Sequence, residues 1–570
     1  MKKERIQGLD GVRAWAIIMI FFYHLYPQLF KGGFIGVSLF FIMSGFLIYV
    51  TTIEKDFLTR KKFHTSSFYA QRLKRIYPSL LIFLGCIAIL FTTILPTGVH
   101  HLFSEGMSAI GSYNNWYQIA QNKSYFAKMS SGSPFTHLWY LSVQMQFYLL
   151  WPIIYLLHKS ILERYGIRRA NYVFIIGIIL SAGLMFILYK PGLDPSRVYY
   201  GTDTRLFTFL IGNLLGSLYI SNKNSNRPKI TNANGIKFSI YVIITAALIF
   251  LVDGNKSYVY RGGMLVIDII LSLFIWIIIN SPKQSLLLNN RILSFIGTYS
   301  FEIYLVHYPI IFYFSHKTRN INLLLTLVII YLTLIVAVIL KLVTTSGVLF
   351  ITMKLKTLIS LTALTGIILL TCQYLISQNP AVQQQNELQA SLNHNKKLIS
   401  KADSKNPPSE KQTSEDMSIS MIGDSVTLGA VEALKNDFKD IEISAKEGRQ
   451  VIQAESIVSN WKKQGSLKKN VVIALGTNGP FTEDVGQSLI DAIGKKHQIY
   501  WINTYGTHLQ WQEKVNDTIA SLARKNKNVH LVDWAKEGAK HQDWFYSDGI
   551  HLIPNAQVEY ANFIKNNITN

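Results

Sequence analysis

Long apolar runs separated by short polar connections fill the first two thirds of the chain. Most of these runs approach the ~20 residues that a helix needs to cross the hydrocarbon of a bilayer. The pattern predicts a multi-span α-helical membrane domain over residues 1–377. We expect about eleven spanning helices, at residues 11–26, 34–53, 77–95, 137–157, 171–189, 203–220, 238–252, 263–280, 292–313, 322–342 and 357–376.

The pattern changes twice after the last apolar run. Residues 378–416 are rich in Asn, Gln, Ser, Lys and Pro and contain no aromatic residue, which predicts a polar linker, extended or loosely helical, that buries no core. From residue 417 to residue 570, strand-like runs such as MSISMIG and NVVIALG alternate with helical stretches such as WQEKVNDTIASLARKN. This alternation predicts an α/β domain with a mainly parallel, flavodoxin-like sheet.

Charge separates the two halves of the chain. From Met417 onward there are 17 Lys or Arg and 17 Asp or Glu, so the whole net charge of +23 lies in the first 416 residues. An excess confined to the apolar half is typical of cytoplasmic loops in a lipid bilayer, and we expect no nucleic-acid partner. The basic connections, such as EKDFLTRKKFHTSSFYAQRLKRIYP, follow alternate helices. This places the N-terminus in the cytoplasm and, after eleven crossings, the C-terminal domain outside the cell.

The first apolar run carries two ionisable residues, Arg13 and His24. Eleven residues are close to three helical turns, so the two side chains share a face about 16 Å apart along the axis. Ionisable groups in a spanning helix are costly unless they face a cavity or a partner, which makes both functional candidates. The alternative is that Arg13 is a positive-inside anchor and His24 an interfacial residue.

Further polar residues lie within or beside the other apolar runs. They form three pairs that are close in sequence: His137 with Gln144, Asp203 with Arg205, and Glu302 with His307. Each could support a site in the membrane, or could simply form a hydrogen bond between helices.

The C-terminal domain contains a second set of candidates. Ser425, in GDSVTLGA, lies at a strand-to-helix turn, and YSDGIHLIPNAQ places Asp548 and His551 three residues apart before a helix. The ends of parallel strands gather the active-site loops of α/β sheets. A serine there can attack a carbonyl if an imidazole takes its proton and an acid orients the imidazole. The backbone N–H groups of Ser425 and Gly448, with the Asn478 amide, could bind the oxyanion.

These motifs, in this order, resemble the SGNH hydrolase family. GDSV resembles its first block, Gly448 its second, GTN its third and DGIH its last. The resemblance implies that Ser425 is the nucleophile, His551 the general base and Asp548 the orienting acid. It also implies an oxyanion hole of Ser425, Gly448 and Asn478, without a metal.

The membrane half resembles the integral-membrane acyltransferase family 3. The matching stretches are GLDGVRAWAIIMIFFYH, GGFIGVSLFFIMSGFLI, RLKRIYP, HLWYLSVQMQFYLLWP, TDTRLFTFLIGN and YSFEIYLVHYP. The resemblance implies a cytoplasmic acyl-coenzyme A donor, with Arg13 and His24 essential, and roles for Arg72 and Arg75. His137, Asp203, Arg205 and His307 are further candidates for supporting this site. In two places the chain departs from the family pattern: Ser38 stands where the family usually has an acid, and Gln144 and Met145 replace a Glu-Glu pair.

An acyltransferase joined to an exported SGNH domain resembles the OatA-like peptidoglycan O-acetyltransferases of Gram-positive bacteria. The resemblance implies transfer of acetyl from acetyl-CoA, with no tightly bound cofactor, to the glycan strand of peptidoglycan, at the 6-hydroxyl of N-acetylmuramic acid. Tyr199 or Tyr200, in a loop predicted outside, could relay the acyl group to Ser425, although either could equally be an interfacial tyrosine. Other acceptors remain open: N-acetylglucosamine, teichoic acid or an exopolysaccharide. A membrane-anchored acetyl esterase is a rival of another class, and the catalytic motifs disfavour a solute transporter.

Overall fold

The structure is a computed structural model with two compact units, Met1–Ile376 and Ser377–Asn570. We call them the membrane unit and the α/β unit and describe each by itself. The structure describes residues 6–58, 63–99, 101–121, 133–190, 195–223, 234–280, 288–318, 321–345, 355–403, 418–507, 509 and 511–569.

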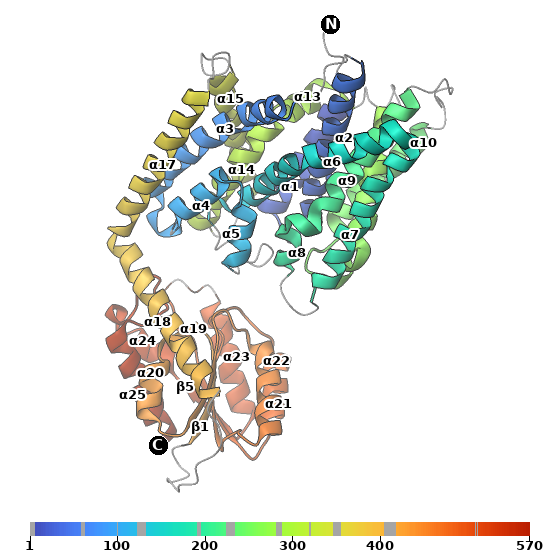
Figure 1. The fold of residues 1–570 in the computed structure, drawn as a ribbon. Coiled ribbons are helices and arrows are strands. Elements are labelled where there is room, and N and C mark those ends of the chain that lie inside the picture. The colour runs from blue at the N-terminus through green and yellow to red at the C-terminus, as the bar shows by residue number, and fades with distance from the viewer. Residues whose placement is uncertain are drawn as a thin grey trace. The chain divides into compact units, whose positions relative to one another are not determined.

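Helices joined by turns and loops make up the described part of the membrane unit (Figure 1). Its helices are α1 (Leu9–Leu25), α2 (Gly36–Ile53), α3 (Thr65–Ile94), α4 (Leu102–Ile110), α5 (Asn114–Ala120), α6 (Trp139–Ala170), α7 (Tyr172–Leu188), α8 (Ser196–Tyr200), α9 (Thr202–Lys223), α10 (Asn234–Leu251), α11 (Met264–Ile279), α13 (Arg291–Thr298), α14 (Ser300–Lys317), α15 (Leu323–Thr345) and α17 (Leu355–Ser377).

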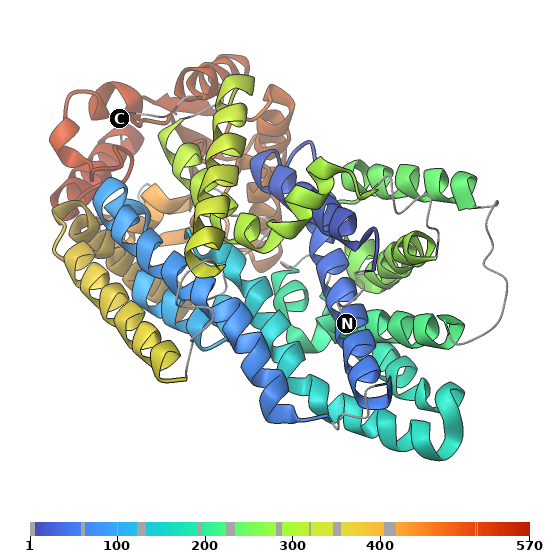
Figure 2. The ribbon, with the colours of Figure 1, turned by 90° about the horizontal axis from the view of Figure 1, so that it is seen from above.

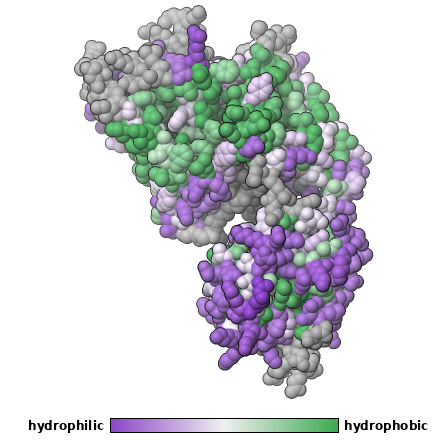
Figure 3. All heavy atoms as spheres, turned by 180° about the vertical axis from the view of Figure 1, so that it is seen from behind, coloured by the Kyte–Doolittle hydropathy of each residue, from purple (hydrophilic) through white to green (hydrophobic). Residues whose placement is uncertain are grey.

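Each of the eleven predicted apolar segments overlaps one of these helices, but some boundaries differ. The segment predicted at 292–313 is divided at Tyr299 into α13 and α14, and α4 and α5 were not expected. Six described helical segments are long and apolar enough to cross a membrane, and two shorter ones, Tyr172–Leu188 and Phe238–Leu251, are also apolar. Apolar side chains dominate the surface of this unit in Figure 3, as lipid contact requires. The multi-span architecture is confirmed, while the number of crossings stays a prediction.

Helix α1 packs against α2 and also against α13 and α14, which come much later in the chain (Figure 2). Helices α2 and α9 approach each other closely because glycines face each other across the contact. A Cβ atom added to Gly45 of α2 would lie 2.1 Å from the Phe209 carbonyl oxygen, and one added to Gly212 of α9 would lie 2.1 Å from that of Ile42. Small residues allow such backbone contact between membrane helices.

The α/β unit is built on a five-stranded parallel sheet in the order β2-β1-β3-β4-β5. Its strands are β1 (Ile419–Gly423), β2 (Ile441–Ala445), β3 (Asn470–Ala474), β4 (Gln498–Ile502) and β5 (Val529–Val532). Its helices are α18 (Pro380–Asp403), α19 (Ser425–Gly429), α20 (Val431–Asp437), α21 (Ala454–Gln464), α22 (Glu483–Ile493), α23 (Gln512–Lys525), α24 (Trp534–Gly538) and α25 (Pro554–Thr569).

Helices cover both faces of this sheet (Figure 1). Alternate strand residues point to opposite faces. In β3, Val472 joins the core beneath α18, α20, α24 and α25, whereas Val471 and Ile473 join the core beneath α21, α22 and α23. The strands are almost continuously apolar because both faces are buried. The predicted α/β fold class is confirmed.

One stretch differs from its expected structure. Within the predicted linker, residues 380–403 form the helix α18, and Leu388 and Leu392 are buried in the core of the α/β unit. The compact unit therefore begins at Ser377 rather than at Met417. Residues 404–416 of the predicted linker lie outside the described residues.

The glycine contact between α2 and α9 gives a test of the fold. Gly212→Val should force the two helices apart and destabilise the protein by about 1–3 kcal/mol, a typical overpacking cost. Gly183→Ala is the control, because no atom lies within 4 Å of a Cβ added there. Thermal unfolding in detergent micelles measures both variants. A wild-type midpoint for Gly212→Val would contradict this packing.

Candidate functional site

The α/β unit brings Ser425, His551 and Asp548 together. Ser425 is the first residue of α19, two residues after the end of β1, and His551 lies in the loop before α25. The Ser425 hydroxyl is 2.8 Å from His551 Nε2, and His551 Nδ1 is 2.6 Å from Asp548 Oδ2. An ionised carboxylate only accepts, so Nδ1 carries the proton and Nε2 accepts from Ser425. This arrangement can take the serine proton when the hydroxyl attacks a carbonyl.

The turn from Asp548 to His551 fixes the acid in place. Asp548 Oδ1 accepts the backbone N–H groups of Ile550 and His551, both at 2.9 Å. Burial alone would raise the pKa of Asp548, but hydrogen bonds from the His551 ring and these amides hold it below its ordinary value. Gly549 has a φ of +67° with Thr507 close to where a Cβ would lie, so the turn requires a glycine.

Two backbone N–H groups near Ser425 could receive a negative oxygen. Gly448 has a φ of +69°, and space around its Cα is open. Among the described residues, neither the Gly448 nor the Ser425 N–H has a hydrogen-bond partner. The Asn478 amide nitrogen lies 3.2 Å from Asp424 Oδ2 and 3.3 Å from the Arg449 carbonyl oxygen. Asn478 therefore contacts the residue before Ser425 and the residue after Gly448.

Two residues of this site were missed by the sequence reasoning, Asp424 and Arg449. Asp424 caps α19 by accepting the Val426 N–H at 3.0 Å. Arg449 donates to the carbonyl oxygens of Gly423 and Ser444, at the ends of β1 and β2. Burial raises the pKa of Asp424 to about 6. An Asp directly before the first helical residue is a capping signal that the sequence already carried.

In the membrane unit, a pair of buried histidines joins α1 to α14. His24 Nδ1 is 2.9 Å from His307 Nε2. His307 Nδ1 lies 2.7 Å from the Tyr304 carbonyl oxygen and 3.1 Å from that of Ile303, and carbonyls only accept. The neutral His307 ring therefore carries its proton on Nδ1, and its Nε2 accepts from His24 Nδ1. The lone pair of His24 is then on Nε2.

A third histidine completes this polar centre. His137 lies in the short helix η4 (Thr136–Leu138) before α6, and its Nε2 is 3.0 Å from the Leu305 carbonyl oxygen. Its ring stands 5.6 Å from that of His307, measured between centroids. Within the described part of the chain, no group of His, Cys, Asp and Glu residues has an arrangement that could hold a metal ion.

Arg13 does not belong to the histidine centre. It lines a cavity of about 620 Å³, and His24 is not among the residues that line this cavity. Arg72, Arg75 and Lys341 line the same cavity. Arg13 also pairs with Asp10 at 2.8 Å, Arg72 stacks over the Tyr148 ring, and Lys341, which sequence reasoning missed, is 3.4 Å from Glu302. Asp10 and Glu54 also line the cavity, so four cations face two carboxylates, and the net charge of +2 suits an anionic ligand.

The ring of Tyr304 links the cavity to the histidines. Tyr304 lines the cavity, and its ring centroid is 5.8 Å from that of His307 and 5.3 Å from that of His137. Gln144, predicted to share a face with His137, also lines the cavity. Tyr304 thus lies between the cavity that Arg13 lines and the histidines.

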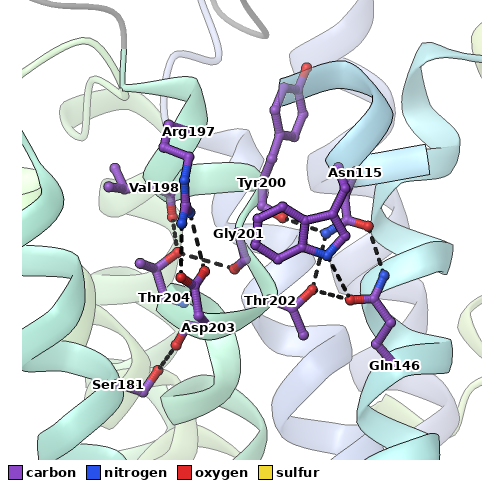
Figure 4. Close-up of polar contacts among 11 residues, drawn as sticks. Asn115, Gln146, Ser181, Arg197, Val198, Tyr200, Gly201, Thr202, Asp203 and Thr204 are labelled. Atoms are coloured by element: carbon purple, nitrogen blue, oxygen red, sulfur yellow. Dashed lines mark hydrogen bonds and ion pairs between the residues drawn. The ribbon is translucent and has the colours of Figure 1, made fainter. Parts of the chain in front are cut away.

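The remaining predicted residues cluster around α8 and the start of α9. Asp203 forms an ion pair with Arg197 at 2.9 Å (Figure 4). The Arg205 guanidinium donates a hydrogen bond to the Ser38 hydroxyl at 2.8 Å. Tyr199 and Tyr200 are fully buried, so the alternative reading of interfacial tyrosines is wrong. The Arg205 guanidinium stands 5.3 Å from the centre of the Tyr199 ring.

A network of amides and hydroxyls holds the turn between α8 and α9 (Figure 4). Asn115 of α5 donates to the Tyr200 carbonyl at 3.1 Å and to Thr202 at 3.0 Å. The side-chain amide of Gln146 in α6 donates a hydrogen bond to Asn115 and accepts one from the Thr202 hydroxyl. Four helices therefore fix the backbone that carries the two tyrosines.

Comparison with known proteins identifies the family of the chain. A family model described as an acyltransferase domain matches residues 6–342. The chain belongs to acyltransferase family 3. OatA, an O-acetyltransferase of Staphylococcus aureus strain NCTC 8325, is 32% identical to this acyltransferase over 96% of the chain and 93% of the relative. YrhL of Bacillus subtilis, provisionally named a peptidoglycan O-acetyltransferase, is 31% identical over 96% of each chain.

One solved structure is also similar to part of this acyltransferase. It is the C-terminal catalytic domain of the Streptococcus pneumoniae peptidoglycan O-acetyltransferase OatA, with a methylsulfonyl adduct. The two are 25% identical, with a TM-score of 0.25, over 26% of this chain and 92% of that chain. The family and the relatives' names identify the protein as a multi-span membrane enzyme that transfers acyl groups.

The pKa of Asp424 generates a pH prediction. Asp424 is charged above about pH 6 and neutral below it, and it interacts electrostatically with His551. The negative charge stabilises the imidazolium that forms when Ser425 loses its proton, so protonating Asp424 should slow the reaction. We therefore expect kcat/KM for a chromogenic acetyl ester to fall more steeply below about pH 6 in the wild type than in Asp424→Asn.

The control for this experiment is Asp543→Asn, an exposed carboxylate in the loop that precedes the Asp548 turn. Its pH profile should match that of the wild type. Identical acid limbs for Asp424→Asn and the wild type would exclude a role for the Asp424 charge.

Proposed function

We propose that this acyltransferase moves acetyl from cytoplasmic acetyl-CoA through the membrane unit to a hydroxyl of peptidoglycan, the 6-hydroxyl of N-acetylmuramic acid. The N-terminus is cytoplasmic and the α/β unit extracellular. The names of the relatives OatA and YrhL support the acetyl group and the cell-wall acceptor. The single observation that carries the proposal is the Ser425–His551–Asp548 arrangement in the same chain as an acyltransferase domain.

The cavity lined by Arg13, Arg72, Arg75 and Lys341 binds the donor in this proposal. Coenzyme A carries several phosphate charges, and guanidinium groups match phosphate oxygens in charge and geometry. A second cavity of about 280 Å³ shares Arg13, Arg75 and Lys341, which extends the cationic wall. The acetyl thioester points inward, toward Tyr304 and the histidines.

His24 performs the first chemical step, and His307 is its positioning residue. With its proton held on Nδ1 by His307, His24 presents the Nε2 lone pair. That nitrogen either takes the proton of the acyl acceptor or accepts the acetyl group itself as the thiol leaves. His137 packs beside this pair and shields it from solvent.

Tyr199 is the proposed next carrier, with Tyr200 as the alternative. The phenol oxygen attacks the acetyl carbonyl and forms an ester, while the phenol proton passes to His24 Nε2 and then to the departing sulfur of coenzyme A. The buried Arg205 guanidinium, 5.3 Å from the Tyr199 ring centre, favours negative charge developing on this side chain. The network around Thr202 keeps the carrier segment in place.

The last two steps take place at Ser425. Its Oγ attacks the acetyl carbonyl, His551 Nε2 takes the proton, and the N–H groups of Ser425 and Gly448, with Asn478, stabilise the oxyanion. The carrier leaves with the proton from His551, and acetyl-Ser425 remains. A sugar hydroxyl then attacks this ester and gives its proton to His551. The tetrahedral intermediate releases the acetylated sugar and restores Ser425.

Cell-wall analysis tests the proposed reaction. A Ser425→Ala strain should lack base-labile acetate on its glycan strands, measured by mass spectrometry of muramic acid fragments. Ser456→Ala, at an exposed position of α21, is the control and should retain acetate at the wild-type level. Enrichment of acetate in the Ser425→Ala strain would instead identify an esterase. Acetate found on another sugar would overturn the acceptor.

The histidine pair gives a separate prediction for the membrane step. His24→Ala should abolish glycan acetylation, and His307→Gln should reduce it by about 10–100-fold, the usual effect of removing the partner that orients a reactive histidine. His316→Gln, near the exposed end of α14, is the matched control. Wild-type acetylation by both His24→Ala and His307→Gln would remove the histidine pair from the pathway.

A further inference from the structure

Helix α18 contacts the short helix that carries Ser425. The Asn395 side chain of α18 is 2% exposed, and its amide donates to the carbonyl oxygens of Leu428 at 2.9 Å and Gly429 at 2.7 Å. Leu428 and Gly429 are the last two residues of α19, and Ser425 is the first. Asn395 therefore supplies hydrogen bonds at the end of α19 opposite to the nucleophile.

These hydrogen bonds matter because α19 has only five residues. Carbonyl groups at the end of a helix have no partner within it, and a single turn of helix is unstable without outside contacts. At the other end of α19, the Asp424 carboxylate accepts the Val426 N–H at 3.0 Å. Both ends of the nucleophile helix are thus held by side chains, one from the preceding residue and one from α18.

Helix α18 is itself fixed to the α/β unit by apolar and polar contacts. Leu388 and Leu392 belong to its core, and Lys435 of α20 donates to the Leu398 carbonyl at 3.2 Å. Lys396 pairs with Glu447 at 2.9 Å. Glu447 directly precedes Gly448, a proposed member of the oxyanion hole. Helix α18 therefore contacts both α19 and the residue next to Gly448.

We propose that α18 is a structural part of the active site and that Asn395 is a positioning residue, which holds α19 so that Ser425 stays within hydrogen-bond distance of His551. This inference rests on the proposed role of Ser425 as nucleophile. The chain between α17 and this active-site element is then only Gln378 and Asn379, in place of a linker of 39 residues.

The test uses the full-length protein in detergent micelles. Asn395→Leu keeps the volume of the side chain but removes both N–H donors, and Asn393→Leu, at an exposed position of the same helix, is the control. The measurements are kcat and KM for a chromogenic acetyl ester, the rate at which a sulfonyl fluoride modifies Ser425, and the thermal unfolding midpoint. We expect kcat and the sulfonylation rate to fall about tenfold in Asn395→Leu, with KM within about twofold, because small displacements of a reacting group are costly. The control should match the wild type.

Unchanged kcat and sulfonylation in folded Asn395→Leu would overturn the inference. If that variant does not fold, the exposed pair of Lys396 and Glu447 provides the test. Lys396→Glu should lower kcat about two- to threefold, and the charge swap Lys396→Glu with Glu447→Lys should restore it. Absence of both effects would likewise overturn the inference.

The same assays separate this inference from the proposed function. Turnover retained in Ser425→Ala would contradict the proposed function itself. An inactive Ser425→Ala together with a fully active, folded Asn395→Leu would contradict only the role of Asn395.

Discussion

Inside a bilayer every polar group must find its partner within the protein, because lipid offers none. This constraint explains the interior of the membrane unit. His24 is bonded to His307, Arg205 to Ser38, and the buried Asp268 of α11 to Thr208. Each pair joins helices distant in the sequence, so the polar groups that supply chemistry also help to fix the packing. The hydrogen bond between His24 and His307 is the central case, because it decides which nitrogen of His24 carries the proton.

The two units use one chemical arrangement in different surroundings. In each, one nitrogen of a histidine is bonded to a fixed partner within the same unit. For His551 the partner is Asp548, a carboxylate that can balance an imidazolium. For His24 it is neutral His307, which avoids placing another charge in lipid. Under the proposed function, Ser425 is therefore activated through a transient ion pair, whereas acyl transfer within the membrane unit uses neutral histidines and the cationic cavity.

The sequence predicted local features well and long-range partners poorly. Helical periodicity placed Arg13 and His24 on one face, and turn motifs placed Ser425 directly after a strand and Asp548 and His551 before a helix. Nothing in one sequence could pair His24 with His307, 283 residues later, or place Lys341 beside Arg13. The polar composition of residues 378–416 concealed α18, although Leu388, Leu392 and Asn395 have the spacing of one helix face. The ring of Tyr199 packs against Phe34 and Trp139, from segments that local patterns cannot connect.

The central claim is that a single chain passes acetyl from coenzyme A on one side of the membrane to Ser425 on the other. The most direct test uses proteoliposomes in which the protein has one orientation. ¹⁴C-acetyl-CoA is enclosed inside the vesicles, and the outer solution at first contains no acceptor sugar. The account predicts labelled acetate on the Ser425 peptide, absent in Ser425→Ala and in His24→Ala. Label that never reaches Ser425, while added glycan strands still become acetylated, would contradict it.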